Sequence, residues 1–519
     1  MTARLKTDSN HSDEPIRPLG SLQQALDDGW RIPKPASYAL LQRLGATARR
    51  LYLLTALWPV IFGLGMSSNA WAQTEVEGEV SGVWDTDGSP YILVGNATVP
   101  EDESLTIEPG VVVVFGEDLT LVVNGQISAV GTEEDTIRFR GPEGLVSGRL
   151  QINANDEDTL SFAYCRFDSM LHAIYAFEHT LIVENCRFVD NIYVRLEGGA
   201  AVFRDNDFFC QLEGLMFVVL REGDADLDSV AIEDNHAHKT LIQIINTTTA
   251  VAQGNISRNY RTPEMPRYSR ISFVDCGRVE VFDNIDCTIT LRNDGRRLDS
   301  AIIENNRLGG LSISANRDWA TTISNNTIAD LGVFNAFAEI NNNDITEFGI
   351  SGMAWIGRAR LERNLLREGV VLEDTCFAEL TNNTIIMPTY FQNDARAVRV
   401  YAGGDDYQST VTMTNNIIVS FGGLPYAVGE TVDNIDGGYN CFWGFEGTYE
   451  GREDNLEGDI VADPHFVGGH PYEYQLQANS PCIDAGDPDS PEDPDGTRAD
   501  IGALFYDQEN GMPPAIISR

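Results

Sequence analysis

The chain is short of positive charge. Among its 519 residues, 36 lysines and arginines stand against 78 aspartates and glutamates, and the formal net charge is −42. A protein that binds nucleic acid must neutralise phosphates with basic side chains, so this balance excludes nucleic acid as an expected partner. Such an acidic surface keeps a protein soluble through self-repulsion and attracts divalent cations or basic surfaces.

Long apolar runs are also missing. The apolar stretch at residues 51–66 is interrupted by Pro59 and is shorter than the roughly 20 residues that a membrane-spanning helix needs. Arg49 and Arg50 precede it and Ala70-Trp71-Ala72 follows, which is the order of a signal peptide cleaved before Gln73. We therefore expect a leader of residues 1–72, export by the general or the twin-arginine route, and no membrane span after cleavage.

Metal-binding cysteine motifs are absent. The eight cysteines are an even number, which allows disulfides in an exported protein without fixing their pairing, but no Cys-x-x-Cys or zinc-ligand spacing occurs. Cys165 and Cys186 each precede Arg-Phe one repeat apart, so we expect them to stack. Because parallel side chains do not favour the dihedral angle of a disulfide, we expect free thiols, with a bond as the alternative.

What the sequence does contain is a repeat built on asparagine. An asparagine returns about every twenty residues, followed one or two residues later by an apolar residue that is aliphatic in all but the first two cases. These asparagines are Asn185, Asn206, Asn235, Asn255, Asn284, Asn306, Asn326, Asn343, Asn364, Asn383 and Asn416. Most intervals are 17 to 22 residues and three are 29 to 33, which indicates one structural unit repeated with occasional longer loops.

The segments between the asparagines are too short for helices. Runs such as Leu181–Val183 and Val279–Phe282 predict strands that stack at roughly 4.8 Å from coil to coil. The sequence therefore predicts an all-β protein, a parallel β-helix of roughly 14 to 16 coils with capped ends. The asparagines are expected to adopt left-handed corners and to bond through their amides from coil to coil.

Other repeat positions receive structural roles on the same grounds. We expect Phe167, Phe188 and Phe208 to form a stack inside the helix. Three further residues, Asp190, Asp205 and Asp234, lie next to repeat asparagines or at the same place in the repeat, which favours turn roles over catalysis.

Two segments near the start, Gly95–Phe115 and Leu121–Gly131, resemble the opening coils of secreted, right-handed, pectin-lyase-like β-helix proteins. Near the other end, Ala462–Val467, Tyr474–Asp487 and Ala499–Ala503 resemble the C-terminal module called the choice-of-anchor Q domain. The resemblance implies a right-handed β-helix over 73–459 and a separate module over 460–519.

The same resemblance bears on location and packing. We expect Leu476, Ile483 and Ile501 of the module to pack onto the last coil as a cap. Such modules often precede a sorting tail, but Phe505–Arg519 contains no apolar anchor. A secreted, a periplasmic and a cell-surface location therefore all stay open.

Candidate site residues lie where the acidic excess disappears. Residues 255–320 hold ten arginines against nine acidic residues, and a lyase acting on uronates needs a base, an acid and a group that neutralises the carboxylate. The catalytic candidates are Lys239, Arg258, Arg261, His236 and His238. The binding candidates are Arg292, Arg296 and Arg297. Ion pairs on a solvated face are the alternative interpretation of this cluster.

A calcium site is a further hypothesis. A Pro- and Gly-rich stretch carries Asp487, Asp489, Asp493, Asp495 and Asp500, whose oxygens suit Ca²⁺, although aspartates are also common in turns.

The function expected from these observations is that of an exported, monomeric β-helix that presents an extended surface to glycan or to another envelope component. No catalytic motif is evident in the repeat. The alternative is a polysaccharide lyase or glycoside hydrolase acting on acidic polysaccharide, and the fold by itself does not choose between these classes.

Overall fold

The computed structural model describes residues 73–511 with short gaps. The gaps are 154–158, 211–215, 222–226, 258–268, 294–299, 316–319, 352–356, 374–375, 389–395, 402–409, 431–433 and 470–472. The chain divides into two units, Met1–Ala70 and Trp71–Arg519, and the described residues all belong to the second. Their regular elements are strands, and none of them forms a helix long and apolar enough to cross a membrane.

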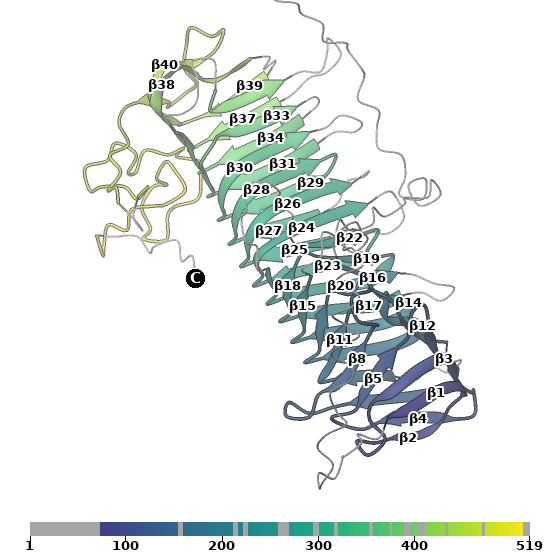
Figure 1. Ribbon diagram of the computed structural model, residues 1–519. Helices are drawn as coiled ribbons and strands as arrows, with labels where there is room; N and C mark the ends of the chain where they lie inside the picture. The colour runs from purple at the N-terminus through teal and green to yellow at the C-terminus, as the bar shows by residue number, and fades with distance from the viewer. Residues whose placement is uncertain are drawn as a thin grey trace, which may run out of the picture. The chain divides into compact units, whose positions relative to one another are not determined.

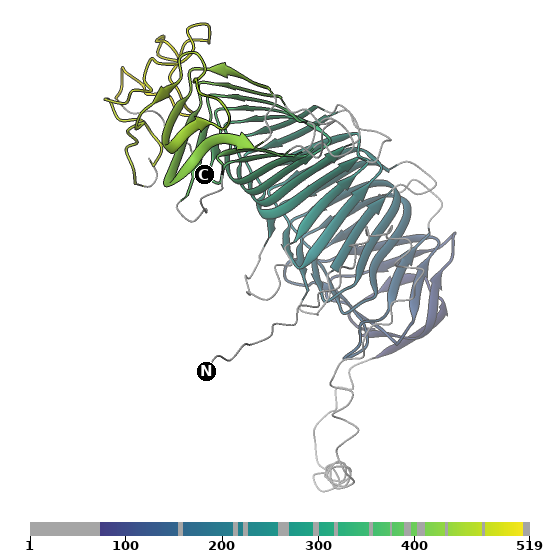
Figure 2. The ribbon, with the colours of Figure 1, turned by 90° about the horizontal axis from the view of Figure 1, so that it is seen from above.

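The strands of successive coils pair in parallel and form three stacks (Figures 1 and 2). We call them A, B and C, in the order in which the chain passes through them in each coil; the corner between A and B is rich in asparagine. Stack A precedes that corner, stack B follows it, and stack C closes the coil. Several long strands bend through a corner and so contribute to two stacks. Because each coil lies directly on the last, every inward side chain has a neighbour above and below.

Stack A consists of β2 (Gly82–Trp84), β4 (Ser104–Ile107), β7 (Gln126–Val130), β10 (Thr159–Ala163), the second halves of β12 (His172–Glu184) and β14 (Tyr193–Arg204), β17 (Leu227–Glu233), β20 (Thr247–Gln253), β23 (Arg278–Phe282), β25 (Ser300–Glu304), β27 (Ala320–Ser324), β29 (Phe337–Asn341), β31 (Gly357–Glu362), β34 (Cys376–Thr381), β37 (Thr410–Thr414) and β39 (Asn434–Gly438).

Stack B consists of the first halves of β1 (Thr74–Glu79) and β3 (Tyr91–Val99), then β5 (Val112–Phe115), β8 (Ile137–Arg140), β11 (Cys165–Asp168), β13 (Arg187–Val189), β15 (Asp207–Phe209), β18 (His236–His238), β21 (Ile256–Ser257), the first parts of β24 (Ile285–Asn293), β26 (Arg307–Ala315), β28 (Thr327–Phe334) and β30 (Asp344–Ser351), β32 (Leu365–Leu366), β35 (Thr384–Met387), the first parts of β38 (Ile417–Glu430) and β40 (Cys441–Tyr449), and β41 (Ile460–Val461).

Stack C adds β6 (Thr120–Val123), β9 (Arg149–Ile152), β16 (Met216–Arg221), β19 (Thr240–Ile245), β22 (Arg270–Val274), β33 (Val370–Glu373) and β36 (Val398–Tyr401) to the remaining halves of the long strands. Stack A has 16 members among the described residues. The predicted fold, a right-handed parallel β-helix of 14 to 16 coils, is thus confirmed.

Side chains alternate between the interior and the outside, and the interior forms one long apolar core. The phenylalanines of stack B show its order, because Phe139, Phe167, Phe188 and Phe208 lie ring on ring with centroids 4.9, 4.9 and 5.0 Å apart. Each of these rings is fully buried. The interior aromatic stack expected from the repeat is confirmed, and its regular spacing follows from the distance between coils.

At the corner between stacks A and B, two neighbouring residues have different structural roles. The first adopts a left-handed conformation, as Asp205, Asp234 and Asn325 do with φ of 54, 53 and 58°. The second is the asparagine whose amide bonds to the next coil: Nδ2 of Asn326 donates to Oδ1 of Asn343 at 2.9 Å. The sequence interpretation had given both tasks to one asparagine.

The ladder of hydrogen-bonding residues differs from the predicted one at both ends. Asn185 is the left-handed residue (φ 53°), and Cys186 takes the ladder position, where its backbone N–H donates to Oδ1 of Asn206 at 2.9 Å. At the far end the ladder continues through Asn440 to Asp459, whose Oδ1 accepts from Nδ2 of Asn440 at 3.1 Å. The turn role expected for Asp190, which has φ of 53°, is also confirmed.

The cysteines follow the expected pattern. Cys165 and Cys186 stack on successive coils, with the N–H of Cys165 3.4 Å from Sγ of Cys186. Both are free thiols, as are Cys210, Cys276, Cys287, Cys441 and Cys482. Burial raises the pKa of the Cys276 thiol to about 12, which keeps it protonated and unreactive.

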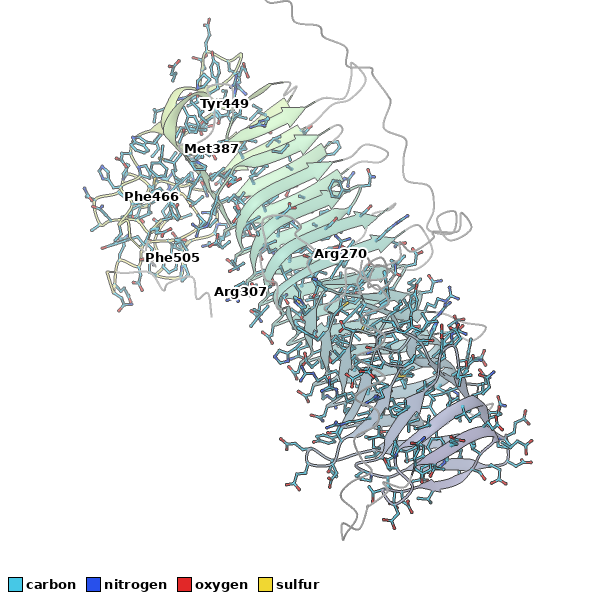
Figure 3. All side chains as sticks on the ribbon, viewed as in Figure 1. Arg270, Arg307, Met387, Tyr449, Phe466 and Phe505 are labelled. Carbon is cyan, nitrogen blue, oxygen red and sulfur yellow. The ribbon has the colours of Figure 1, made fainter. Side chains whose placement is uncertain are left out.

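The C-terminal segment packs against the side of the solenoid, whereas the sequence interpretation placed it on the last coil as an end cap. Leu476, Cys482 and Ile501 bury themselves against the outward side chains of stack B on four successive coils, β32, β35, β38 and β40. Figure 3 shows Phe466 of this segment beside the end of the solenoid that carries Met387. The segment therefore covers the outer face of these coils.

Candidate functional site

The predicted basic residues that the structure describes do not form a single site. His236 and His238 point outward from β18 in stack B, where the ring of His238 stacks on Phe209 with centroids 5.1 Å apart. Lys239 forms the corner after them, with φ of 51°. Arg292 is exposed on β24 in stack C. Arg258, Arg261, Arg296 and Arg297 lie outside the described residues.

Four of the five aspartates proposed for calcium accept hydrogen bonds within the C-terminal segment, and Asp493 also lies 3.8 Å from Arg363 of the solenoid. Oδ1 of Asp487 accepts the N–H of Asp489 at 2.9 Å, and Oδ1 of Asp495 accepts Oγ1–H of Thr497 at 2.8 Å. Oδ2 of Asp493 accepts the N–H of Asp500 at 2.6 Å. In the described part of the chain, no group of three or more His, Cys, Asp or Glu side chains is placed to hold a metal ion.

A different group of side chains does converge, on the outer face of stack C. We call it the outer cluster, and it consists of Arg149, His172, Tyr175, Tyr193, Arg195, Glu197, Phe217 and Arg221. The parallel register places these residues in adjacent columns on four successive coils, β9, β12, β14 and β16. Outward residues alternate along these strands except at a register shift between His172 and Ile174, so one coil contributes one to three of them.

One column of the outer cluster is aromatic. The His172 ring lies 5.1 Å from the Tyr193 ring, which in turn lies 5.6 Å from the ring of Phe217, in stacked orientation. Tyr175 adds a tilted contact to His172 at 5.2 Å. All four rings are only half-buried, so the column is a ridge that presents aromatic surface to the solvent.

The neighbouring columns are polar and centred on Glu197. Its Oε1 accepts the hydroxyl of Tyr175 at 3.2 Å and Nη2 of Arg221 at 3.0 Å, and it is also paired with Arg195. The Arg195 guanidinium lies over the Tyr175 ring, 5.2 Å from its centroid. With Arg149, three guanidinium groups stand against one carboxylate, so the outer cluster is cationic on an otherwise acidic protein.

The environment also keeps His172 neutral. Burial, followed by the charges of Arg149 and Arg195, lowers the pKa of this imidazole to about 4. Its Nδ1 is buried and has no hydrogen-bond partner among the described residues. Burial likewise raises the pKa of Tyr175, whose phenol keeps its proton. The outer cluster therefore combines a neutral base, a phenolic donor and guanidinium groups.

Sequence reasoning missed this cluster because it looked for a local excess of arginine. A signal was present, since His172-Ala-Ile-Tyr-Ala-Phe177 alternates aromatic and small or aliphatic residues and is followed one repeat later by Tyr193-Val-Arg-Leu-Glu197. Showing that these outward positions share a face required the register between coils.

The comparisons with known proteins concern the fold. A family model described as "Right handed beta helix region" matches residues 272–435. Among solved structures, the chain is similar to one described as "Crystal structure of pectate lyase Pel9A", with 14% identity, a TM-score of 0.21, and coverage of 78% of this chain and 88% of that chain. At so low a TM-score, the likeness carries no conclusion about function. No curated protein matches the chain.

Proposed function

We propose that the protein is exported and binds an extended acidic glycan along the outer face of stack C. The observation that carries the proposal is the outer cluster, where a ridge of aromatic rings lies beside a cationic group of arginines. Guanidinium groups match carboxylates geometrically, and aromatic faces supply the apolar contact surface of a ligand site. The leader inferred from residues 1–72 supports export.

The net charge of the whole molecule limits where an acidic glycan can bind. A polyanion is repelled by a protein of net charge −42, so it binds only where the local charge is reversed. The outer cluster, with three arginines and one glutamate, provides that reversal. Binding should then weaken with added salt, because exposed charges are screened over about 10 Å at 0.1 M ionic strength.

The test is calorimetric titration of residues 73–519 with polygalacturonate and alginate at low salt. Changing Tyr193 or Arg195 to alanine should lower the affinity on the order of tenfold, the loss of one charge-assisted bond or aromatic contact. Arg187, which lies outward in stack B with its side chain 52% exposed, is the matched control, and Arg187→Ala should bind normally. Failure to bind any acidic polysaccharide would reject the proposal.

A second candidate function is a lyase at the same cluster, favoured by neutral His172. In β-elimination, the imidazole takes the C5 proton of a uronate, the C4–O bond breaks as the C4–C5 double bond forms, and Tyr175 gives its proton to the leaving oxygen. Arg195 is placed to neutralise the carboxylate. Ultraviolet absorbance of unsaturated ends, present in the wild type and lost in His172→Gln with binding retained, would identify this activity.

Hydrolysis receives less support from the outer cluster. Glycoside hydrolases use two carboxyl groups about 5 to 9.5 Å apart, and this cluster contains one, Glu197. Products with saturated non-reducing ends would favour hydrolysis, because elimination leaves a C4–C5 double bond at that end.

A further inference from the structure

A hollow surface lies on stack A, on a different face of the solenoid from the outer cluster. It is a shallow concavity of about 350 Å³ on the outer side of β29, β31, β34 and β37. We call it the Phe–Arg groove, and its lining includes Phe337, Arg358, Arg360, Phe377, Glu379 and Thr410. None of these residues takes part in the outer cluster.

The parallel register explains how the groove arises. Phe337, Arg358, Phe377 and Thr410 follow one another in a single outward column, one per coil. Two aromatic rings therefore stand two coils apart, roughly 9.5 Å at the usual strand spacing, with an arginine between them. The three large side chains are followed in the column by the smaller Thr410.

The groove contains a guanidinium group that is available to a ligand. Nε of Arg360 is held by Oε2 of Glu379 at 2.7 Å. The Arg358 guanidinium instead lies over the Phe377 ring at 5.6 Å, and no carboxylate of the described residues lies within ion-pair distance of it. The Phe377 side chain is large and apolar, yet this residue is 39% exposed. An apolar ring beside a cation with no ion-pair partner among the described residues suits a ligand that has an apolar face and an anionic group.

The pairing of the backbone around the groove excludes a peptide ligand that binds by adding a strand. β31 and β34 are paired on both sides with their neighbours, so their N–H and C=O groups are not available to a peptide that adds a strand. Recognition must therefore use side chains on a shallow surface. A sugar ring bearing a carboxylate meets this requirement, because its C–H face covers an aromatic ring while the carboxylate receives a guanidinium fork.

We propose that the Phe–Arg groove is a second glycan subsite, specific for a carboxylated sugar. The sugar ring lies on Phe377, its carboxylate pairs with Arg358, and its hydroxyls reach Thr410 and Thr412. This subsite does not depend on the outer cluster, since the two surfaces lie on different stacks.

The experiment must separate the two surfaces. In a Tyr193→Ala/Arg195→Ala background, which disables the outer cluster, residues 73–519 are titrated with a galacturonate trisaccharide and with its neutral, carboxyl-reduced form. The acidic sugar should bind and the neutral one should bind on the order of tenfold more weakly. Adding Arg358→Gln or Phe377→Ala should lower the affinity for the acidic sugar by a similar factor.

The chain supplies a matched control. Arg278 stands in the same outward column of stack A, on β23, where it is paired with Glu280. Arg278→Gln should leave binding unchanged, and melting temperatures show whether each variant is folded. The proposal is overturned if the background protein binds no acidic sugar, if it binds the neutral form equally well, or if Arg358→Gln and Phe377→Ala both bind like the background. None of these outcomes bears on the outer cluster, which is tested with Arg358 intact.

Discussion

The ladder asparagine is the residue that repeats most faithfully in this protein, and its bonds explain why. Asn326 accepts at Oδ1 from the N–H and Nδ2 of Asn306 at 2.8 and 2.9 Å. Its own Nδ2 donates to the carbonyl of Ile303 on the previous coil at 2.9 Å. The short amide side chain offers two donor hydrogens and two acceptor lone pairs, whereas a hydroxyl offers only one donor. The residue before it, Asn325, adopts the left-handed conformation of the corner.

The first prediction separates these two tasks. Asn326→Ala should destabilise the folded protein by about 2–4 kcal/mol, because buried partners on two coils lose their hydrogen bonds. Asn325→Gly should change stability by less than about 1 kcal/mol, since glycine adopts a positive φ without strain. Denaturant unfolding of both variants measures the difference. Equal losses would show that the ladder amide contributes nothing beyond its corner.

The second prediction concerns the coil where a cysteine interrupts the ladder. Sγ of Cys186 lies 3.4 Å from the carbonyl of Phe162, the place taken in the next coil by Nδ2 of Asn206, which donates to the carbonyl of Val183 at 2.8 Å. Cys186→Asn should therefore extend the ladder and stabilise the protein by about 0.5–1.5 kcal/mol. Cys186→Ala, the control, should destabilise it. A loss of stability in the asparagine variant would contradict this account.

At the scale of elements, the C-terminal segment is held to stack B by apolar contacts and by corner asparagines. Nδ2 of Asn382 donates to the carbonyl of Asp500 at 2.8 Å, and Oδ1 of Asn415 accepts the N–H of Asp487 at 2.7 Å. Both asparagines are left-handed corner residues next to the ladder. The corner thus supplies the outward bonds that fix the segment.

The third prediction follows from the apolar surface that this segment covers. Removing residues 460–519 exposes Ile386, Ile417 and Val419 to water, and the shortened protein should aggregate or lose cooperative unfolding. Within the intact chain, Ile501→Ala should cost about 2–5 kcal/mol, whereas Val461→Ala, at a position 65% exposed, should cost less than about 0.5 kcal/mol. A truncated protein that stays monomeric with unchanged melting would show that the segment is an independent appendage.

The fourth prediction concerns pH. Burial raises the pKa of Asp500 to about 6, above its usual value near 4, although its oxygens accept the N–H groups of Asp484 and Tyr506 at 2.7 and 2.6 Å. A carboxyl group with a raised folded-state pKa favours the folded state when protonated. Its contribution is complete below about pH 4 and is lost as the pH rises to about 6.

The melting temperature should therefore fall as the pH rises from 4 to 6.5, with this group contributing on the order of 2 kcal/mol. Growing repulsion among the other carboxylates as they ionise acts in the same direction, so the diagnostic variant is Asp500→Asn. It should flatten the pH dependence even if it lowers stability at every pH. An unchanged slope would remove Asp500 from the explanation.

At the scale of the whole molecule, the three stacks give the protein three long outer faces with different surfaces. Stack C carries the outer cluster, stack A carries the Phe–Arg groove, and the later coils of stack B are covered by the C-terminal segment. In Figure 3, Arg270 of stack C and Arg307 of stack B lie on different sides of the solenoid. A solenoid separates such surfaces because each coil contributes a few outward side chains to every face.

The fifth prediction concerns the mature protein. Because Arg49 and Arg50, the apolar stretch and Ala70-Trp71-Ala72 occur in the order of a signal peptide, material recovered outside the cytoplasm should begin at or near Gln73. N-terminal sequencing of that fraction decides the matter. Detection of Met1 on exported protein would refute cleavage, and fractionation would assign the protein to the periplasm, the surface or the medium.

The sequence by itself determined the architecture. A period near twenty residues, short alternating strands and asparagines at the corners are local features, and stacking identical units satisfies all of them in a single way. The turn aspartates and the phenylalanine stack followed for the same reason. The error of one residue at Asn185 arose because adjacent corner positions both accept asparagine, and only the hydrogen bonds distinguish them.

The tertiary structure alone decided which outward residues share a face. Tyr193 follows His172 by 21 residues and Phe217 follows Tyr193 by 24, while Thr410 follows Phe377 by 33, so loops of unequal length hide the alignment that hydrogen-bonded register restores. The sequence also did not reveal where the C-terminal segment docks. It depends on apolar side chains such as Ile386 and Ile501, which come from distant parts of the chain and meet only once the coils are stacked.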